Sequence, residues 1–169
     1  MWNFTGKGRP DFAVEPGPGQ ESVWDYPRPP VADPCDREVR VVSGGTLIAK
    51  SAATFRLKET ASPPTFYLPP DALEPETLVP APGQSFCEWK GVARYFAFRD
   101  DPTQTIAWCY PDPSRAFSVL RDYVSFYPGR VECYVDGERV RPQAGGFYGG
   151  WITRDVVGPF KGDPGTGHW

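Results

Sequence analysis

The stretch SFCEWKG, residues 85–91, and the segment ARYFAF that follows it, residues 93–98, hold the densest group of reactive side chains in the sequence. A thiol (Cys87) and an amine (Lys90) lie three residues apart, and Gly91 ends the turn that carries them. Residues 93–98 have the pattern of a β-strand. We therefore expect a turn that presents a thiol and an ammonium together at the start of a strand.

Short strand patterns continue on both sides of this stretch. The 21 prolines and 18 glycines disfavour long helices and favour short strands and turns. Gly44-Gly45 predicts a hairpin turn, and residues 71–82 and 99–104 are expected to be a proline-rich loop and a polar turn. Ser114 is a suitable cap for one short helix that ends near Asp122. Strands are predicted at residues 39–42, 46–49, 54–59, 65–68, 105–110, 124–127 and 131–135.

Composition divides the chain into three segments. Residues 1–37 read as an extended, proline-rich arm, residues 38–140 as a mainly β domain, and residues 141–169 as a glycine- and aromatic-rich tail. Trp24 and Tyr26 in the arm either bind a partner's aromatic groove or, as we favour, pack on the chain's own domain. The tail is expected to pack on the domain or on a partner, which leaves a homodimer open.

Charge and cysteine content exclude several classes of protein. A net charge of −3 argues against an extended nucleic-acid surface. We find no signal peptide and no apolar run of membrane-spanning length, so a soluble cytoplasmic protein is expected. The four cysteines form no C-x-x-C pair and His168 is the single histidine, so we expect free thiols, no metal site and no cofactor.

Six short motifs, in order, resemble the bacterial domain of unknown function 427 family over about residues 38–140, and the arm and tail resemble a longer subgroup of it. The motifs are RVV and GG at 40–45, LKET at 57–60, TFYLP at 65–69, FCEWKGVARY at 86–95, AWCYP at 107–111 and YVSFY at 123–127. The resemblance implies a β-tent-like fold, in which two small antiparallel sheets meet at an angle. Relatives with that architecture often bind zinc through two pairs of cysteines, which this chain lacks, so no structural zinc is expected.

Cys87, Lys90 and Glu59 are the candidates for catalysis, although the sequence assigns no reaction. An ammonium near Cys87 favours its thiolate, and Glu59, at the end of a strand, could pair with Lys90 or act as a general base. The alternative is a cysteine buried between Phe86 and Trp89 with Lys90 in solvent and Glu59 on the surface. Nucleophilic catalysis lacks a histidine base other than His168.

Aromatic residues on neighbouring strand patterns complete the predicted site, although each could equally belong to the β core. We expect a polar, aromatic-walled pocket for a flat or anionic small molecule. Its predicted ligand-binding residues are Glu59, Tyr67, Cys87, Lys90, Tyr95, Trp108 and Tyr110.

Two other classes of function stay open: an enzyme that uses this pocket for thiol or nucleotidyl-transfer chemistry, and a structural or interaction scaffold. The family is sometimes catalogued under a nucleotidyltransferase-type name, but its activity is not established. No D-x-D pair follows Gly44-Gly45, and the sequence contains neither a phosphate-binding G-x-x-x-x-G-K-[ST] loop nor a G-x-G-x-x-G motif.

Overall fold

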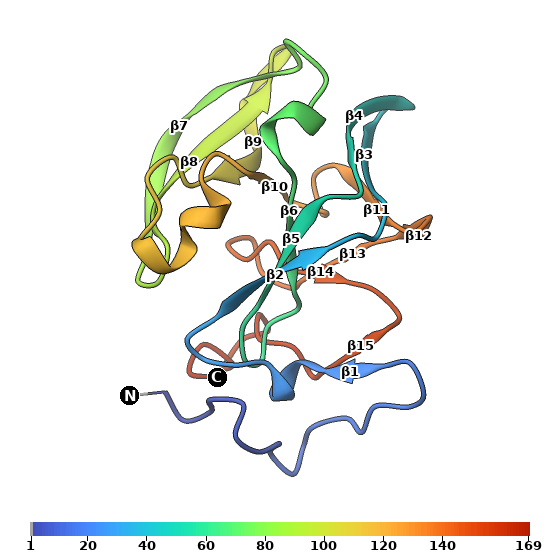
Figure 1. The fold of residues 1–169 in the computed structure, drawn as a ribbon, viewed down its shortest axis with the longest axis vertical. Helices are drawn as coiled ribbons and strands as arrows, with labels where there is room; N and C mark the ends of the chain where they lie inside the picture. Colours follow the sequence, from blue (N-terminus) through green and yellow to red (C-terminus); the bar gives the residue numbers. More distant parts are fainter. Residues whose placement is uncertain (1) are drawn as a thin grey trace.

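The structure is a computed structural model that describes residues 2–169, and it consists mainly of short β-strands (Figure 1). The strands in the first half of the chain are β1 (Glu21–Ser22), β2 (Val31–Cys35), β3 (Val39–Ser43), β4 (Thr46–Ser51), β5 (Thr54–Lys58), β6 (Thr65–Tyr67) and β7 (Leu78–Cys87). Those in the second half are β8 (Gly91–Phe98), β9 (Asp101–Cys109), β10 (Val124–Phe126), β11 (Glu132–Val135), β12 (Glu138–Arg139), β13 (Arg141–Pro142), β14 (Trp151–Ile152) and β15 (Val156–Val157). The prediction of a mainly β fold is confirmed, and the strands form several small sheets, most of them antiparallel.

The three longest strands, β7, β8 and β9, form a four-stranded antiparallel sheet with β10, in the order β10-β9-β8-β7. Two sequence predictions are wrong here, because β7 begins inside the expected loop 71–82 and β9 begins inside the expected turn 99–104. β7 contains Pro80 and Pro82, and the register shifts between Ala81 and Gln84. β7 is an edge strand, where a proline need not donate to a neighbouring strand, so its prolines are compatible with pairing.

A second four-stranded sheet has the order β12-β11-β3-β4. The predicted hairpin at Gly44-Gly45 is confirmed, since it joins β3 to β4 and both glycines have positive φ angles of 55° and 79°. The two four-stranded sheets spread apart toward the top of Figure 1. A three-stranded sheet, β2-β5-β6, lies at the centre of the view.

The ends of the chain pack on these sheets. β2 lies in the predicted arm and pairs with β5, Trp24 is completely buried, and Tyr26 is nearly so. In the tail, β14 pairs with β13 and β15 pairs in parallel with β1. The ring of Phe12 stacks on that of Trp169 with centroids 5.2 Å apart, so arm and tail meet. The division into arm, domain and tail remains a prediction, although all three contribute to one packed structure.

The helical segments are short and of 3-10 type: η1 (Val23–Asp25), η2 (Pro70–Ala72) and η3 (Arg115–Leu120). The helix predicted from Ser114 corresponds to η3, which is kinked at Phe117. The predicted capping role of Ser114 is wrong: its side chain forms no cap hydrogen bond and donates instead to the carbonyl of Trp89, 2.6 Å away.

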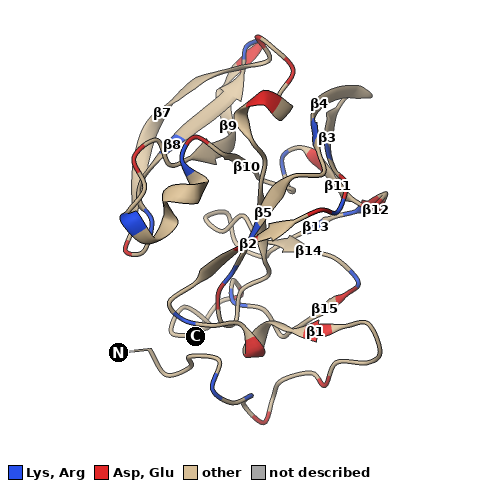
Figure 2. Ribbon diagram, viewed as in Figure 1, with Lys and Arg blue, Asp and Glu red and all other residues tan. Residues whose placement is uncertain are grey.

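An apolar core lies between the two four-stranded sheets. It contains mostly aliphatic side chains from β3, β4, β9 and β11, together with Phe66 of β6, Phe126 of β10 and Trp151 of β14. The Trp151 indole donates to the Phe126 carbonyl at 3.0 Å, which fixes the tail to this core. Positive and negative side chains are interspersed over the ribbon of residues 2–169 (Figure 2). None of the helical segments in this part of the chain has the length and apolar character needed to cross a membrane.

Candidate functional site

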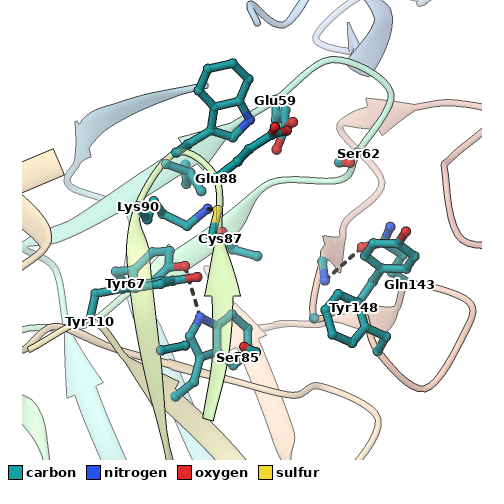
Figure 3. Close-up of a pocket in the computed structure, with 18 of the residues that line it drawn as sticks. Glu59, Ser62, Tyr67, Ser85, Cys87, Glu88, Lys90, Tyr110, Gln143 and Tyr148 are labelled. Atoms are coloured by element: carbon teal, nitrogen blue, oxygen red, sulfur yellow. Dashed lines mark hydrogen bonds between the residues drawn. The ribbon is translucent and has the colours of Figure 1, made fainter. Parts of the chain in front are cut away.

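A cavity of about 440 Å³ lies between the β7–β8 hairpin, strands β5 and β6, and the tail (Figure 3). All seven predicted binding residues line it, so the structure brings together side chains from five separate stretches of sequence. The other lining residues are Trp2, Leu57, Ser62, Pro63, Thr65, Ser85, Phe86, Glu88, Trp89, Ala93, Tyr127, Gln143, Phe147, Tyr148, Gly149 and Gly150.

The alternation of side chains along β6 and β9 builds the aromatic wall. Phe66 and Ala107 enter the apolar core, whereas the residues that follow them, Tyr67 and Trp108, lie on the opposite face. The Trp108 indole N–H donates to the Tyr67 hydroxyl at 3.1 Å, and the two rings meet edge to face. The Tyr67 hydroxyl keeps its own proton available for another acceptor, because it accepts this bond.

The turn between β7 and β8 places Lys90 inside the cavity. Cys87 is the last residue of β7 and pairs with Gly91, the first residue of β8, whose φ angle of 103° is accessible chiefly to glycine. Ser114 holds the turn from outside: its N–H donates to the Lys90 carbonyl at 3.0 Å, in addition to its hydroxyl bond to Trp89. This anchoring fixes the direction of the Lys90 side chain.

Lys90 is a buried cation whose hydrogen-bond partner is a thiol. Only 6% of the residue is exposed, its Nζ donates to Cys87 Sγ at 3.2 Å, and Nζ lies 5.4 Å from the centroid of the Tyr110 ring. The alternative prediction of a solvated Lys90 is therefore wrong. Burial lowers the pKa of Lys90, but the ionisable Tyr67 and Cys87 beside it more than offset this effect, so the pKa is raised and the ammonium form persists at neutral pH.

Burial also shifts the pKa values of the two tyrosines beside Lys90. Loss of solvation raises the pKa of Tyr67, against the opposing effects of Lys90 and the Trp108 hydrogen bond. Loss of solvation also raises the pKa of Tyr110. Figure 3 shows both hydroxyls directed toward the part of the cavity that holds Lys90 and Cys87. This inner end is therefore rich in hydrogen-bond donors.

Glu59 lies just after β5 and does not pair with Lys90, in contrast to one of the sequence hypotheses. Its carboxylate forms an ion pair of 3.2 Å with Arg28, whose side chain is only 2% exposed. Arg28 also donates to the carbonyls of Phe4 and Thr60. Glu59 acts on Lys90 from a longer range, as one of the negative charges that raise its pKa.

Sequence reasoning missed the parts of the site that come from the two ends of the chain. The ring of Trp2 lies between the Arg28 guanidinium, 4.2 Å from its centroid, and the Lys161 ammonium, 4.7 Å from it. Gln143 accepts from the N–H of Gly150 at 3.0 Å and so holds the tail against the cavity. The glycine–aromatic composition of the tail was the available signal, but composition does not tell which surface a tail covers.

Two polar atoms at the cavity lack a partner among residues 2–169. Thr65 Oγ1 and the indole nitrogen of Trp89 are buried and form no hydrogen bond there. Tyr95 is satisfied, since its hydroxyl donates to Ser85 Oγ at 2.6 Å. Buried polar atoms without partners are uncommon in folded proteins. In the described part of the chain, no group of three or more His, Cys, Asp and Glu residues is arranged to hold a metal ion.

Together these features define a mainly β protein with an aromatic-walled cavity around a buried lysine. The chain belongs to the family described as Domain of unknown function (DUF427), whose model matches residues 31–137. A search of curated proteins finds no match. The seven predicted site residues lie inside the matched region, whereas Trp2 and the tail residues of the cavity lie outside it.

Proposed function

We propose that this protein binds a small, flat organic molecule that carries an acidic group. The observation that carries the proposal is the state of Lys90: a buried ammonium in a cavity, hydrogen-bonded to the Cys87 thiol and without a salt bridge to any carboxylate of residues 2–169. A buried charge without an opposite charge is costly, and an anionic ligand would supply that charge. The acidic group would accept hydrogen bonds from Lys90 and from the Tyr67 and Tyr110 hydroxyls.

The walls of the cavity favour a ring. Trp108 and Tyr127 lie with their ring centroids 4.6 Å apart, and Tyr67 and Tyr110 are 6.4 Å apart. Aromatic faces in a water-poor cavity stack on flat ligands and add apolar area that leaves water on binding. Phe86 of the hairpin and Phe147 of the tail are 74% and 70% exposed, and both line the cavity, so they would cover a ring at its mouth.

Native mass spectrometry and thermal unfolding of the full chain test this function. A retained ligand would add mass that is lost on denaturation, and ring compounds with an acidic group should raise the melting temperature because they bind only the folded state. The variant Lys90→Met should abolish both effects. Lys50→Met, on β4 and about half exposed, is the matched control and should change neither. Equal stabilisation of wild type and Lys90→Met would contradict the proposal.

Thiol chemistry is the second candidate function, and the Cys87–Lys90 contact of 3.2 Å favours it. An ammonium beside a cysteine stabilises the thiolate, which is the nucleophilic form. We expect iodoacetamide to alkylate Cys87 in the native protein faster than in the unfolded chain, and Lys90→Met to remove the difference. A native rate below the unfolded rate would argue against this candidate and leave ligand binding unaffected.

A further inference from the structure

The charges that line the cavity limit the kind of acidic group it accepts. Of the described residues that border it, Lys90 is the one with a positive side chain, whereas Glu59 and Glu88 are negative. Figure 3 shows Glu59 and Glu88 on the side of Lys90 away from Tyr67 and Tyr110. An anion bound at Lys90 therefore contacts one ammonium, and the carboxylates of Glu59 and Glu88 lie behind that ammonium.

Two further cations lie near these carboxylates, but both are already engaged. Arg28 forms its ion pair with Glu59 and stacks on Trp2. The Lys161 ammonium also makes a cation–π contact with the Trp2 ring, and its Nζ donates to a main-chain oxygen of Trp169 at 3.1 Å. Burial and the nearby Arg28 lower the pKa of Lys161, while Glu59 and Glu88 act in the opposite direction. These cations balance the carboxylates and leave one unmatched positive charge, that of Lys90.

We propose that the cavity selects flat aromatic compounds with a single negative charge, and carboxylates over phosphate esters. The inference rests on the proposed function and specifies its ligand class. A carboxylate has one charge and two acceptor atoms, which match Lys90 and the two tyrosine hydroxyls. A phosphate monoester carries a charge of about −1.5 to −2 at neutral pH, and the excess would face Glu59 and Glu88 without a cation to balance it.

The backbone around Lys90 also lacks the usual features of a phosphate site. Phosphate sites commonly use arginine forks, helix N-termini or glycine-rich loops whose N–H groups converge. Lys90 lies in a hairpin turn between two strands, and the backbone N–H of Ser114 next to it is already bonded to the Lys90 carbonyl. A nucleoside phosphate, with two or more charges, should therefore bind this end of the cavity more weakly than a monoanion.

Three probes with the same ring separate charge from shape: naphthoate, naphthalenesulfonate and naphthyl phosphate. The dissociation constants are measured by calorimetry on the full chain at neutral pH. We expect naphthoate and naphthalenesulfonate, both monoanions, to bind, and naphthyl phosphate to bind at least about tenfold more weakly because of the charge repulsion. Lys90→Met should weaken naphthoate binding by about 10- to 100-fold, the usual effect of losing a charged hydrogen-bond donor. Lys50→Met should bind naphthoate like wild type.

A second variant keeps the test decisive if Lys90→Met folds poorly. Glu88→Gln removes one repelling charge at an exposed position, so it should bring the affinity for naphthyl phosphate closer to that for naphthoate. Phosphate binding as tight as carboxylate binding, with the same dependence on Lys90, would overturn the inference and leave the proposed function intact. Binding of none of the three probes at millimolar concentration, or binding that does not change in Lys90→Met, would overturn both.

Discussion

The two faces of β6 and β9 make the most informative comparison in this molecule. One face contributes Phe66, Ala107 and Cys109 to the sealed apolar core. The opposite face contributes Tyr67 and Trp108 to the cavity, where each aromatic ring carries a polar group at its tip. Both faces are well buried, so burial alone does not distinguish the structural side from the candidate functional side.

The chemistry of the two faces does distinguish them. On the core side, the polar side-chain groups are the Cys109 and Cys133 thiols and the Trp151 indole N–H, which is already bonded to the Phe126 carbonyl. On the cavity side, hydroxyls, an indole N–H and the Cys87–Lys90 pair line the cavity. Successive side chains of a strand point to opposite faces, so a single strand can serve both purposes. Stability and binding should therefore respond to different substitutions at adjacent positions.

The largest effect is expected from the core side. Phe66→Ala removes a completely buried ring that packs against Trp151, with centroids 5.2 Å apart. We expect the free energy of unfolding to fall by about 3–5 kcal/mol, the usual cost of such a cavity. Urea unfolding measures this loss. Phe86→Ala, at an exposed position, is the control and should stay within about 0.5 kcal/mol of wild type; similar losses in both variants would contradict the comparison.

An intermediate effect is expected where the tail touches the cavity wall. A Cβ on Gly149 would lie 2.3 Å from an atom of the Trp108 ring, too close for any side chain. Gly149→Ala should therefore displace the tail or the ring and cost about 1–3 kcal/mol of stability. Thermal unfolding and limited proteolysis of residues 143–150 report the change. Gly146→Ala, where a Cβ meets nothing within 4 Å, is the matched control and should be cut no faster than wild type.

A smaller effect on stability is expected from Tyr67→Phe, although its effect on binding should be clear. The substitution removes the acceptor of the Trp108 indole bond, whose net contribution is about 1 kcal/mol. Affinity for naphthoate should fall about tenfold, since a donor to the acidic group is lost. Calorimetry and urea unfolding separate the two effects. Tyr134→Phe on β11 should change neither, and unchanged naphthoate affinity in Tyr67→Phe would count against the assigned donor.

Sequence patterns predicted the parts of this structure that depend on local chemistry. The Gly44-Gly45 hairpin followed from turn preferences, and the strand on either side of it followed from its residues. The strand β7 was missed because prolines normally oppose pairing, and only its position at the sheet edge permits them. Whether a strand lies at the edge or at the centre depends on the whole sheet. A local sequence pattern does not contain that information.

The residues of the candidate site also fall into a group that the sequence predicted and a group that it missed. The seven residues on strands and the hairpin were named from the sequence, and the structure places them around one cavity. The partner of Glu59 was missed because Arg28 is 31 residues away in a segment expected to be an extended arm. Trp2 and Gln143 were missed because their positions depend on how the two ends fold back over the domain, and that is decided by long-range packing.

A last prediction tests whether the core side is sealed from solvent, and its effect appears at alkaline pH. Burial, followed by the negative charge of Asp122, raises the pKa of Cys109 from 9.0 to about 11. The unfolded chain would release this proton near pH 9, while the folded protein retains it to about pH 11. The contribution to stability is therefore complete below pH 9 and is lost as the pH rises to 11.

Urea unfolding of wild type and Cys109→Ala across this range provides the measurement. The variant has no thiol to ionise, so its stability should fall less steeply, and the gap between the two proteins should narrow as the pH rises from 9 to 11. Burial raises the pKa of Cys133 as well, so Cys133→Ala should behave in the same direction. A constant gap in both variants would mean that the folded protein ionises these thiols as readily as the unfolded chain. The core side of β9 would then not be sealed from solvent, and the comparison between the core side and the cavity side would be wrong.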